Sequence, residues 1–327
     1  MAAPPTVTAA GPREITPGPA SSFWTRMRGG DEFAYAITFA SACAVLAITA
    51  LLVLELYMNS GPSRAKFGWN FLFTQTWDPV ADQYGALPFI YGTLVTSAVA
   101  LIFGVPLGVG AAIFLAELAP PKISDGLTFL IELLAAVPSV IYGLLGIFVL
   151  VPILKQLEPA IRAVFGWTHL FTGPFYGVSL FSAGIVLSVM IVPFIISISR
   201  EVIMAVPSDQ REAALALGAT KWESTWDIVV PFAFKGIMGS VFLALARSLG
   251  ETMAVTMVVG NDPKIKASLF APGYSIAAVI ANEFTEATGQ MYTSALIELG
   301  LVLFALTVVI NGMARVLVAA GDRGVKK

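Results

Sequence analysis

Six apolar stretches, each long enough to cross a lipid bilayer, run through this chain of 327 residues. A helix rises 1.5 Å per residue, so about 20 apolar residues span the roughly 30 Å hydrocarbon core. Only 12% of the residues are charged, which excludes a water-soluble globule that needs a charged surface. We therefore predict an all-α integral membrane protein with six transmembrane helices. The predicted spans are Ala34–Met58, Pro88–Leu118, Gly126–Leu154, Gly177–Ser199, Phe232–Val259 and Thr293–Ala319.

The distribution of Lys and Arg predicts how these spans are oriented. With the N-terminus inside, twelve of the 19 Lys and Arg residues fall on the cytoplasmic side, six fall in outer loops, and Arg247 lies within a span. Positive charge is enriched in the cytoplasmic loops of membrane proteins, so this orientation is favoured. We expect a multi-pass protein of the cell membrane, in contact with membrane lipids and with both termini in the cytoplasm.

The parts outside the spans carry further predictions. Residues 1–30 are rich in Pro, Ala, Gly, Ser and Thr without a periodic apolar pattern, so burial there cannot offset the entropy of ordering. We expect a disordered cytoplasmic arm over 1–30 and a transmembrane domain over 31–327. Aromatic residues of the outer loops are predicted to anchor at the membrane interface. These are Trp69, Trp77, Tyr84, Trp167 and Tyr176.

Several functional classes are excluded by composition. The chain has a single Cys, Cys43, and a single His, His169, so a disulfide framework, a zinc site and Cys/His catalysis lack the necessary ligands. No metal is expected. The net charge is −2 and no basic block is present, so no nucleic-acid partner is expected.

A polar segment over 200–231 separates the fourth and fifth apolar stretches. It contains Glu212-Ala213-Ala214, then Gly218 after three residues and Ile228-Val229-Val230-Pro231 after nine more. This spacing resembles the EAA loop of ABC importer permeases, with Val230 where that loop carries Leu. The resemblance implies a type I, MetI-like permease architecture with a cytoplasmic coupling loop at 200–231. An ordinary amphipathic loop is the alternative.

The residues of this segment also predict a helix-turn-helix knob. We expect Asp209 to cap a first short helix that ends at Gly218, and Thr220 and Glu223 to form the capping box of a second. Pro231 suits the first turn of the following apolar helix, because its missing N–H has no partner there.

In the resembled family, this knob docks into a groove of the ATP-binding subunit. The residues that would couple to the ATPase are Glu212, Ala213, Ala214, Gly218, Ile228 and Pro231. The chain has no Gly-x-x-x-x-Gly-Lys-[Ser/Thr] loop of its own. We therefore expect a transport subunit without an ATPase site and without a cofactor in this chain, and we expect ATP and Mg to be bound by partner subunits.

Arg247 lies near the middle of the predicted fifth span, and Glu251 four residues later shares its helical face if the span is one helix. An arginine at the bilayer centre costs about 2.5–3.5 kcal/mol, so such residues face a bundle interior or a wet cavity. Its planar guanidinium can bind an oxyanion through two hydrogen bonds, and Glu251 could hold it while no anion is present. A purely structural ion pair is the alternative. The hydroxyls of Ser248 and Thr252 could also donate to an anion, although such groups more often bond their own backbone.

The stretch Arg247-Ser248-Leu249-Gly250-Glu251-Thr252-Met253-Ala254-Val255 resembles the Arg-x-x-Gly-Glu-Thr-Met-Ala-Val segment of PstC-type permease subunits of phosphate ABC importers. Val137–Gly143, which contains Ser139, resembles the third span of that family, and the similarity runs from about residue 33 to the C-terminus. The resemblance implies phosphate translocation along a pathway that includes Arg247, Glu251, Ser248, Thr252 and Ser139. It also implies a PstA-type permease as heterodimer partner, two PstB-type ATP-binding subunits and an extracytoplasmic PstS-type phosphate-binding protein.

Three other readings remain open from the residues alone. A permease for sulfate or molybdate needs the same loop and an anion-binding residue. An ATP-independent anion channel or secondary transporter could also use six spans and a buried Arg–Glu pair. A lipid-modifying membrane enzyme is disfavoured, because no nucleophile-base pair is evident. Near the outer end of the last span, Glu283, Glu286 and Glu298 are expected to form a solvated interface face.

Overall fold

The computed structural model describes residues 31–325, and six of the helices in this range are long and apolar enough to cross a membrane. The prediction of an all-α protein with six such helices is confirmed, since no strand occurs within 31–325. The disordered arm predicted for 1–30 lies outside the described residues. The six helical segments are Glu32–Asn59, Leu87–Leu118, Ser139–Phe165, Leu180–Met204, Lys221–Leu249 and Gln290–Val316.

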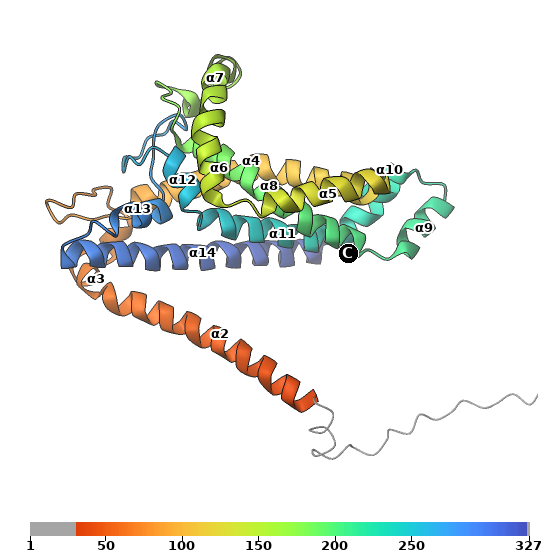
Figure 1. The fold of residues 1–327 in the computed structure, drawn as a ribbon, viewed down its shortest axis with the longest axis horizontal. Helices are drawn as coiled ribbons and strands as arrows, with labels where there is room; N and C mark the ends of the chain where they lie inside the picture. Colours follow the sequence, from red (N-terminus) through yellow and green to blue (C-terminus); the bar gives the residue numbers. More distant parts are fainter. Residues whose placement is uncertain (1–30, 326–327) are drawn as a thin grey trace, which may run out of the picture. The chain divides into compact units, whose positions relative to one another are not determined.

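The elements follow one another along the chain as Figure 1 shows, and the chain divides into two units, 1–55 and 56–327. The first span is formed by α2 (Asp31–Asn59). Between the first and third spans lie α3 (Gly61–Phe67), η1 (Gly68–Leu72), α4 (Leu87–Ile113), η2 (Phe114–Leu118) and α5 (Pro121–Ala135). The third span is built from α6 (Ser139–Leu145), η3 (Gly146–Leu150) and α7 (Val151–Phe165), followed by η4 (His169–Phe171). The remainder comprises α8 (Leu180–Met204), α9 (Ser208–Ala216), α10 (Lys221–Ser224), η5 (Thr225–Val229), α11 (Val230–Leu249), α12 (Met253–Val258), α13 (Ile276–Glu283) and α14 (Gln290–Val325).

In the second unit, α4 and α8 form the central pair, and α11 packs on α8. Small residues let these helices approach closely. A Cβ placed on Gly184 of α8 would lie 2.4 Å from Cγ1 of Val99 on α4, so only glycine fits there. The hydroxyls of Ser199 on α8 and Ser240 on α11 are 2.7 Å apart and share a hydrogen bond. This buried polar link fixes the register of α11 against the core.

The predicted third span, Gly126–Leu154, is wrong at its start. Helix α5 ends at Ala135, and a new helix begins only at Ser139. Pro138 explains the break, because it lacks an N–H and disfavours helical backbone at Val137. As a result α5 is a separate helix that packs on α8, and the span runs on from Ser139 to Phe165.

The predicted fifth span, Phe232–Val259, is not one helix. It begins earlier, because α10, η5 and α11 are continuous from Lys221, and it stops at Leu249. Pro231 lies in the first turn of α11, as expected, but this turn continues a running helix and follows the π-helical turn Thr225–Val229 by one residue. A π turn is a common way to accommodate a missing backbone donor. After a break over 250–252, the short helix α12 follows.

The predicted interface anchors Trp77 and Tyr84 instead form a packed cluster with Glu283 and Tyr292. Trp77 Nε1 donates to Glu283 Oε2 at 2.9 Å, and the Tyr292 hydroxyl donates to the same oxygen at 2.7 Å. Tyr84 is buried, and burial together with the neighbouring Asp82 raises the pKa of its hydroxyl to about 12. The expectation of a solvated face is wrong for Glu283, whose carboxylate is held by this cluster.

Glu298 departs from the same expectation, because its side chain is buried in α14. Of the other predicted anchors, Trp69, Trp167 and Tyr176 are exposed.

Candidate functional site

Arg247 lies in the last turn of α11, and its side chain is exposed in the isolated chain. Its guanidinium carbon is 5.9 Å from the ring centroid of Phe194 on α8. Within 31–325, the ion pairs join other residues and none includes Arg247. The guanidinium therefore presents its planar set of N–H donors to whatever occupies the space beside α11.

The structure separates Glu251 from the face that carries Arg247. Glu251 lies in the break between α11 and α12, and its Oε1 accepts a hydrogen bond from the backbone N–H of Ala254 at 3.2 Å. The expectation of one helical face is wrong, because the helix ends at Leu249 and the chain turns at Gly250. A carboxylate in this position caps the first turn of α12 and interacts favourably with its dipole.

The hydroxyls predicted to assist an anion are both engaged with backbone carbonyls. Ser248 is buried and its Oγ donates to the Leu245 carbonyl at 2.9 Å. Thr252 Oγ1 donates to the Gly250 carbonyl at 3.3 Å. Each hydroxyl has one proton, so in this state neither can donate to an anion. Both hydroxyls therefore follow the alternative given above, in which such groups bond the backbone of their own chain segment.

Ser139 begins α6, which packs against α12. A Cβ placed on Gly143 would lie 3.3 Å from the Cα of Ala254, so the two helices almost touch there. Ser139 precedes Gly143 by four residues and therefore lies on the same face of α6. The fold thus brings Ser139 towards the segment that Glu251 caps.

The polar segment after α8 forms two short helices, α9 and α10, at one end of the second unit (Figure 1). Gly218 ends the first of them with φ +91°, a left-handed conformation that suits glycine. The capping box of α10 is confirmed, with Thr220 Oγ1 accepting from the Glu223 N–H at 3.3 Å and Glu223 Oε2 accepting from the Thr220 N–H at 2.7 Å. Asp209 is not the cap of α9, because the helix begins at Ser208 and Asp209 lies in its first turn.

The knob presents an exposed surface that combines acidic and apolar side chains. Glu212 and Ala213 are exposed, whereas Ala214 is buried in the knob. Leu217 is 91% exposed, which is unusual for a leucine outside the membrane-spanning stretches. Ile228 is half-buried in the π-helical turn and Pro231 is exposed just beyond it. We call the exposed residues Glu212, Ala213, Leu215, Leu217, Trp222 and Trp226 the coupling surface, after the role that the sequence resemblance predicts for this segment.

The coupling surface is tied to the membrane helices by an ion pair that the sequence did not reveal. Arg211, directly before Glu212, donates from Nη2 to Glu117 Oε1 at 2.7 Å, and from Nε to the same oxygen at 3.0 Å. Arg211 Nη2 also donates to the Ile203 carbonyl at 2.8 Å. Glu117 belongs to η2 at the end of the second span, so this one side chain joins α9, α8 and the α4–η2 helix. The signal available in the sequence for this ion pair was Glu117, a lone carboxylate at the end of an apolar stretch.

Comparison with known proteins agrees with this geometry. Residues 104–320 match the family described as "Binding-protein-dependent transport system inner membrane component". The phosphate transport system permease protein PstC of Mesorhizobium japonicum is 47% identical over 290 residues, covering 87% of this chain and 89% of that protein. PstC of Pasteurella multocida is 45% identical over 282 residues, with 85% and 88% covered, and PstC 2 of Mycobacterium tuberculosis is 38% identical over 305 residues, with 91% and 94% covered.

A solved structure of a bacterial ABC transporter involved in alginate import contains a chain that is 16% identical to this one, with a TM-score of 0.52. The likeness covers 89% of this chain and 98% of that chain, and at this identity it shows the fold alone. The predicted ABC importer permease architecture is confirmed. This chain belongs to the family of binding-protein-dependent transport system inner-membrane components, together with the permeases named PstC.

Proposed function

We propose that this chain is one of two permease subunits that carry inorganic phosphate across the cytoplasmic membrane in an ABC importer. The observation that carries the proposal is the extent of similarity to relatives named as phosphate permeases, which includes the segment with Arg247. An exposed guanidinium in the last turn of a membrane helix suits a tetrahedral oxyanion, because its planar fork can donate two parallel hydrogen bonds.

Arg247 alone does not neutralise a phosphate dianion. The proposal therefore includes a second permease of the PstA type, which would face α11 and supply further donors. Because the hydroxyls of Ser248 and Thr252 are engaged with backbone carbonyls, they would contribute only after the segment around Glu251 rearranges. Ser139 would lie beside that segment on α6.

Energy for transport would come from outside this chain. ATP and Mg would be bound by two PstB-type subunits that dock on the coupling surface, with Glu212 at its centre. The coupling surface would then lie in the cytoplasm with both termini, as the excess of Lys and Arg on that side favours. A PstS-type binding protein would deliver phosphate to the opposite face and supply the high affinity, since tight binding within the pathway would slow release.

The test is uptake of labelled phosphate into vesicles that contain this chain with its candidate partners. We expect uptake that requires ATP and the binding protein and that a large excess of unlabelled sulfate leaves unchanged. Suppression by sulfate or molybdate would keep the permease and replace its substrate. Uptake without ATP would identify a channel or secondary transporter and would contradict the coupling role of Glu212.

A further inference from the structure

A pocket of about 820 Å³ lies beside α3 and the first turns of α14, at the end of the second unit opposite the coupling surface (Figure 1). The residues that line it come from the last turn of α2 and from α3, η1, α4 and α14, and none of them belongs to α11. Two of these lining residues are charged, Arg64 and Glu298. We propose that this pocket binds a phospholipid with a primary amine headgroup, whose ammonium group donates to Glu298 and whose phosphate accepts from Arg64.

Glu298 carries a buried acceptor that the fold leaves without a hydrogen bond. The residue is 5% exposed and lies about two turns into α14. Ser63 of α3 lies beside its carboxylate, but Oε2 has no hydrogen-bond partner among the described residues. A buried carboxylate oxygen is costly to leave unpaired, so a donor from outside the chain is expected beside it.

Arg64 is held in place with part of its guanidinium unused. Nε donates to Ser60 Oγ at 2.9 Å, and Nη2 donates to the Tyr57 carbonyl. The guanidinium carbon also lies 3.6 Å from the centroid of the Tyr57 ring. Among residues 31–325, no hydrogen bond engages the N–H groups of Nη1. A guanidinium fixed in this way is preorganised to donate to a phosphate oxygen.

A hydrogen bond between α3 and α14 keeps the two charges at one pocket. The Ser63 N–H donates to Ser294 Oγ at 3.1 Å, one turn of α14 before Glu298. Arg64 follows Ser63 directly, yet no ion pair within the described part of the chain joins it to Glu298. Both charged groups therefore remain available to a ligand that carries the two opposite charges.

The headgroup of phosphatidylethanolamine carries these two charges close together. Its ammonium group, like that of lysine, has three N–H donors, which suit the unpaired Oε2 of Glu298. The trimethylated amine of phosphatidylcholine has no N–H to donate, and the glycerol headgroup of phosphatidylglycerol has no positive charge. The pocket should therefore distinguish phosphatidylethanolamine from both of these lipids.

The rest of the pocket wall suits an acyl chain. Apolar side chains continue along α14 from Glu298 at intervals of three and four residues, so they share one face of the helix. They are Leu301, Val302, Ala305, Leu306 and Val309. Leu87 and Ile90 of α4 also line the pocket. Its volume lies within the roughly 300–1,000 Å³ of ligand sites in proteins.

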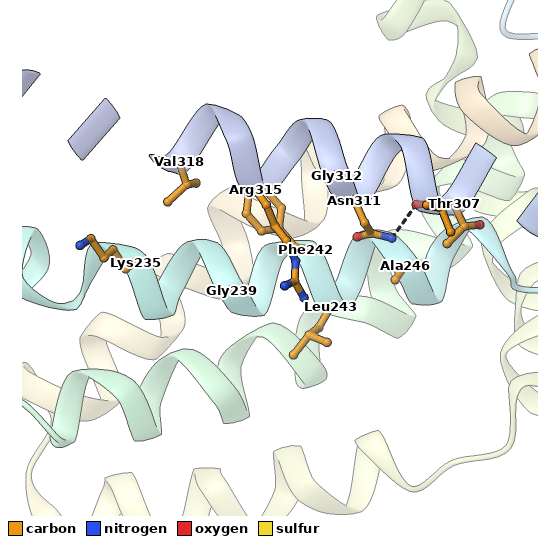
Figure 2. Close-up of a pocket in the computed structure, with 11 residues that line it drawn as sticks. Lys235, Gly239, Phe242, Leu243, Ala246, Thr307, Asn311, Gly312, Arg315 and Val318 are labelled. Carbon is orange, nitrogen blue, oxygen red and sulfur yellow. Dashed lines mark hydrogen bonds between the residues drawn. The ribbon is translucent and has the colours of Figure 1, made fainter. Parts of the chain in front are cut away.

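The groove drawn in Figure 2 lies further along α14, between that helix and α11. There Asn311 Nδ2 donates to the Thr307 carbonyl at 2.9 Å, and Thr307 Oγ1 donates to the Leu303 carbonyl at 2.8 Å. None of the unpaired buried side-chain atoms found within 31–325 lines this groove. The proposed second permease would also face α11, so we assign the lipid to the pocket at Glu298 alone.

The experiment uses the purified complex of this chain with its partner subunits, exposed in detergent to equal amounts of phosphatidylethanolamine, phosphatidylcholine and phosphatidylglycerol. Native mass spectrometry counts the lipids retained, and the result does not depend on which anion the importer carries. We expect phosphatidylethanolamine to be retained about tenfold more than either other lipid, as a hydrogen bond between charged groups implies.

Glu298→Gln is the most specific variant, because it removes the charge that the ammonium group needs and keeps the shape of the side chain. We expect the two amine lipids to be retained about equally in this variant, with retention of phosphatidylcholine unchanged. A merely structural role for Glu298 would leave the preference as it was. Arg64→Gln should instead weaken retention of all three lipids about tenfold, since each of them carries the phosphate.

The matched control is Lys66→Gln with Glu286→Gln, which removes an exposed cation and an exposed carboxylate that do not line the pocket. This pair should retain phosphatidylethanolamine as the unaltered complex does. A further variant, Ala305→Phe, keeps both charges and fills the apolar wall, and it should also lose the lipid. Elution volume and melting temperature establish that each variant complex is assembled.

Equal retention of phosphatidylethanolamine and phosphatidylcholine by the unaltered complex overturns the proposal, as does an undiminished preference in Glu298→Gln or an equal loss in the control pair. Displacement of the lipid by millimolar phosphoethanolamine also overturns it, because the acyl chain would then contribute nothing. A photo-reactive phenylalanine analogue in place of Phe73, which lines the pocket, should crosslink to lipid. A crosslink to a partner permease or to residues 31–55 of this chain would show a protein occupant instead.

Discussion

The guanidinium of Arg211 binds the carboxylate of Glu117, although 94 residues separate the two in the chain. Nη2 lies 2.7 Å from Oε1, and Nε lies 3.3 Å from Oε2. The pair is largely buried, with 23% and 12% of the two side chains exposed. Arg211 immediately precedes Glu212 of the coupling surface. The ion pair therefore joins α9 directly to the end of the α4–η2 helix, and we expect a displacement of α9 to move that end as well.

Replacing Glu117 by Gln removes the charge and leaves one oxygen as a hydrogen-bond acceptor in place of two. We expect Glu117→Gln to lower the free energy of unfolding by about 1–3 kcal/mol, as for a weakened charged hydrogen bond. The rate of phosphate uptake should fall more than this loss of stability accounts for, because a movement of α9 would no longer move the α4–η2 helix. ATPase activity stimulated by the binding protein is the measurement. Glu132→Gln, on the exposed side of α5, is the control, and normal stimulation in Glu117→Gln would show that coupling takes another route.

Substitutions of Arg247 test whether its side chain is part of the anion pathway. We expect Arg247→Gln to abolish phosphate uptake while the complex assembles normally, since the side chain makes no ion pair among residues 31–325 that its loss would break. Arg247→Lys keeps the charge but loses the planar fork, so uptake should fall at least about tenfold. Labelled uptake at matched expression measures both variants. Undiminished uptake in Arg247→Gln would remove the residue from the pathway.

Substitutions of Glu251 distinguish a role in capping α12 from a role in an ion pair. If the carboxylate mainly caps α12, Glu251→Gln retains an acceptor for the Ala254 N–H and should keep nearly normal stability. Glu251→Ala should then lower the free energy of unfolding by about 1 kcal/mol, the usual cost of a lost cap. Thermal unfolding of the purified complex compares the two. Equal destabilisation by both substitutions would indicate that the negative charge itself is needed.

The sequence was sufficient for the number of membrane helices, because each is set by a long apolar run. It was also sufficient for the capping box at Thr220 and Glu223 and for the left-handed end at Gly218, since both depend on residues within one turn. The breaks inside spans were harder to predict. Pro138 divides a continuous apolar run, and hydropathy alone does not register a missing backbone donor.

Tertiary contacts account for the other differences. The break after Leu249 is a local exception, in which Glu251 accepts a hydrogen bond from the Ala254 N–H, and a helical wheel drawn through Arg247 and Glu251 cannot show it. Glu283 was expected to be solvated, yet Trp77 reaches it from 206 residues away. The pairing of Glu117 with Arg211 is of the same kind. Such contacts are set by how the helices pack, and the local pattern around each residue does not specify its distant partner.

The coupling surface is exposed, so changes there should separate docking from folding. We expect Glu212→Lys to leave the melting temperature of the membrane subunits unchanged while the ATP-binding subunits dissociate or hydrolyse ATP without transport. Leu217→Ser should weaken docking in the same way, because a side chain that is 91% exposed contributes little to the fold. Co-purification of the ATP-binding subunits is the measurement. A stable complex with normal stimulated hydrolysis in both variants would place the docking site elsewhere.

Gly92 gives the sharpest test of packing in the second unit. A Cβ at this position of α4 would lie 2.1 Å from the backbone carbonyl oxygen of Tyr274, which cannot move aside as a side chain could. The next residue, Thr93, accepts at Oγ1 from the Ile276 N–H at 2.9 Å, so the two segments are also fixed by a hydrogen bond.

We expect Gly92→Ala to lower the free energy of unfolding by at least about 1–3 kcal/mol, the usual cost of overpacking, and to reduce the yield of assembled complex. Gly110→Ala is the matched control, because Gly110 lies in the same helix and its Cβ would meet no atom within 4 Å. Helix propensity alone favours alanine over glycine at both positions. Thermal unfolding of the two variants should therefore shift in different directions, and equal behaviour would contradict the close approach of α4 to the segment before α13.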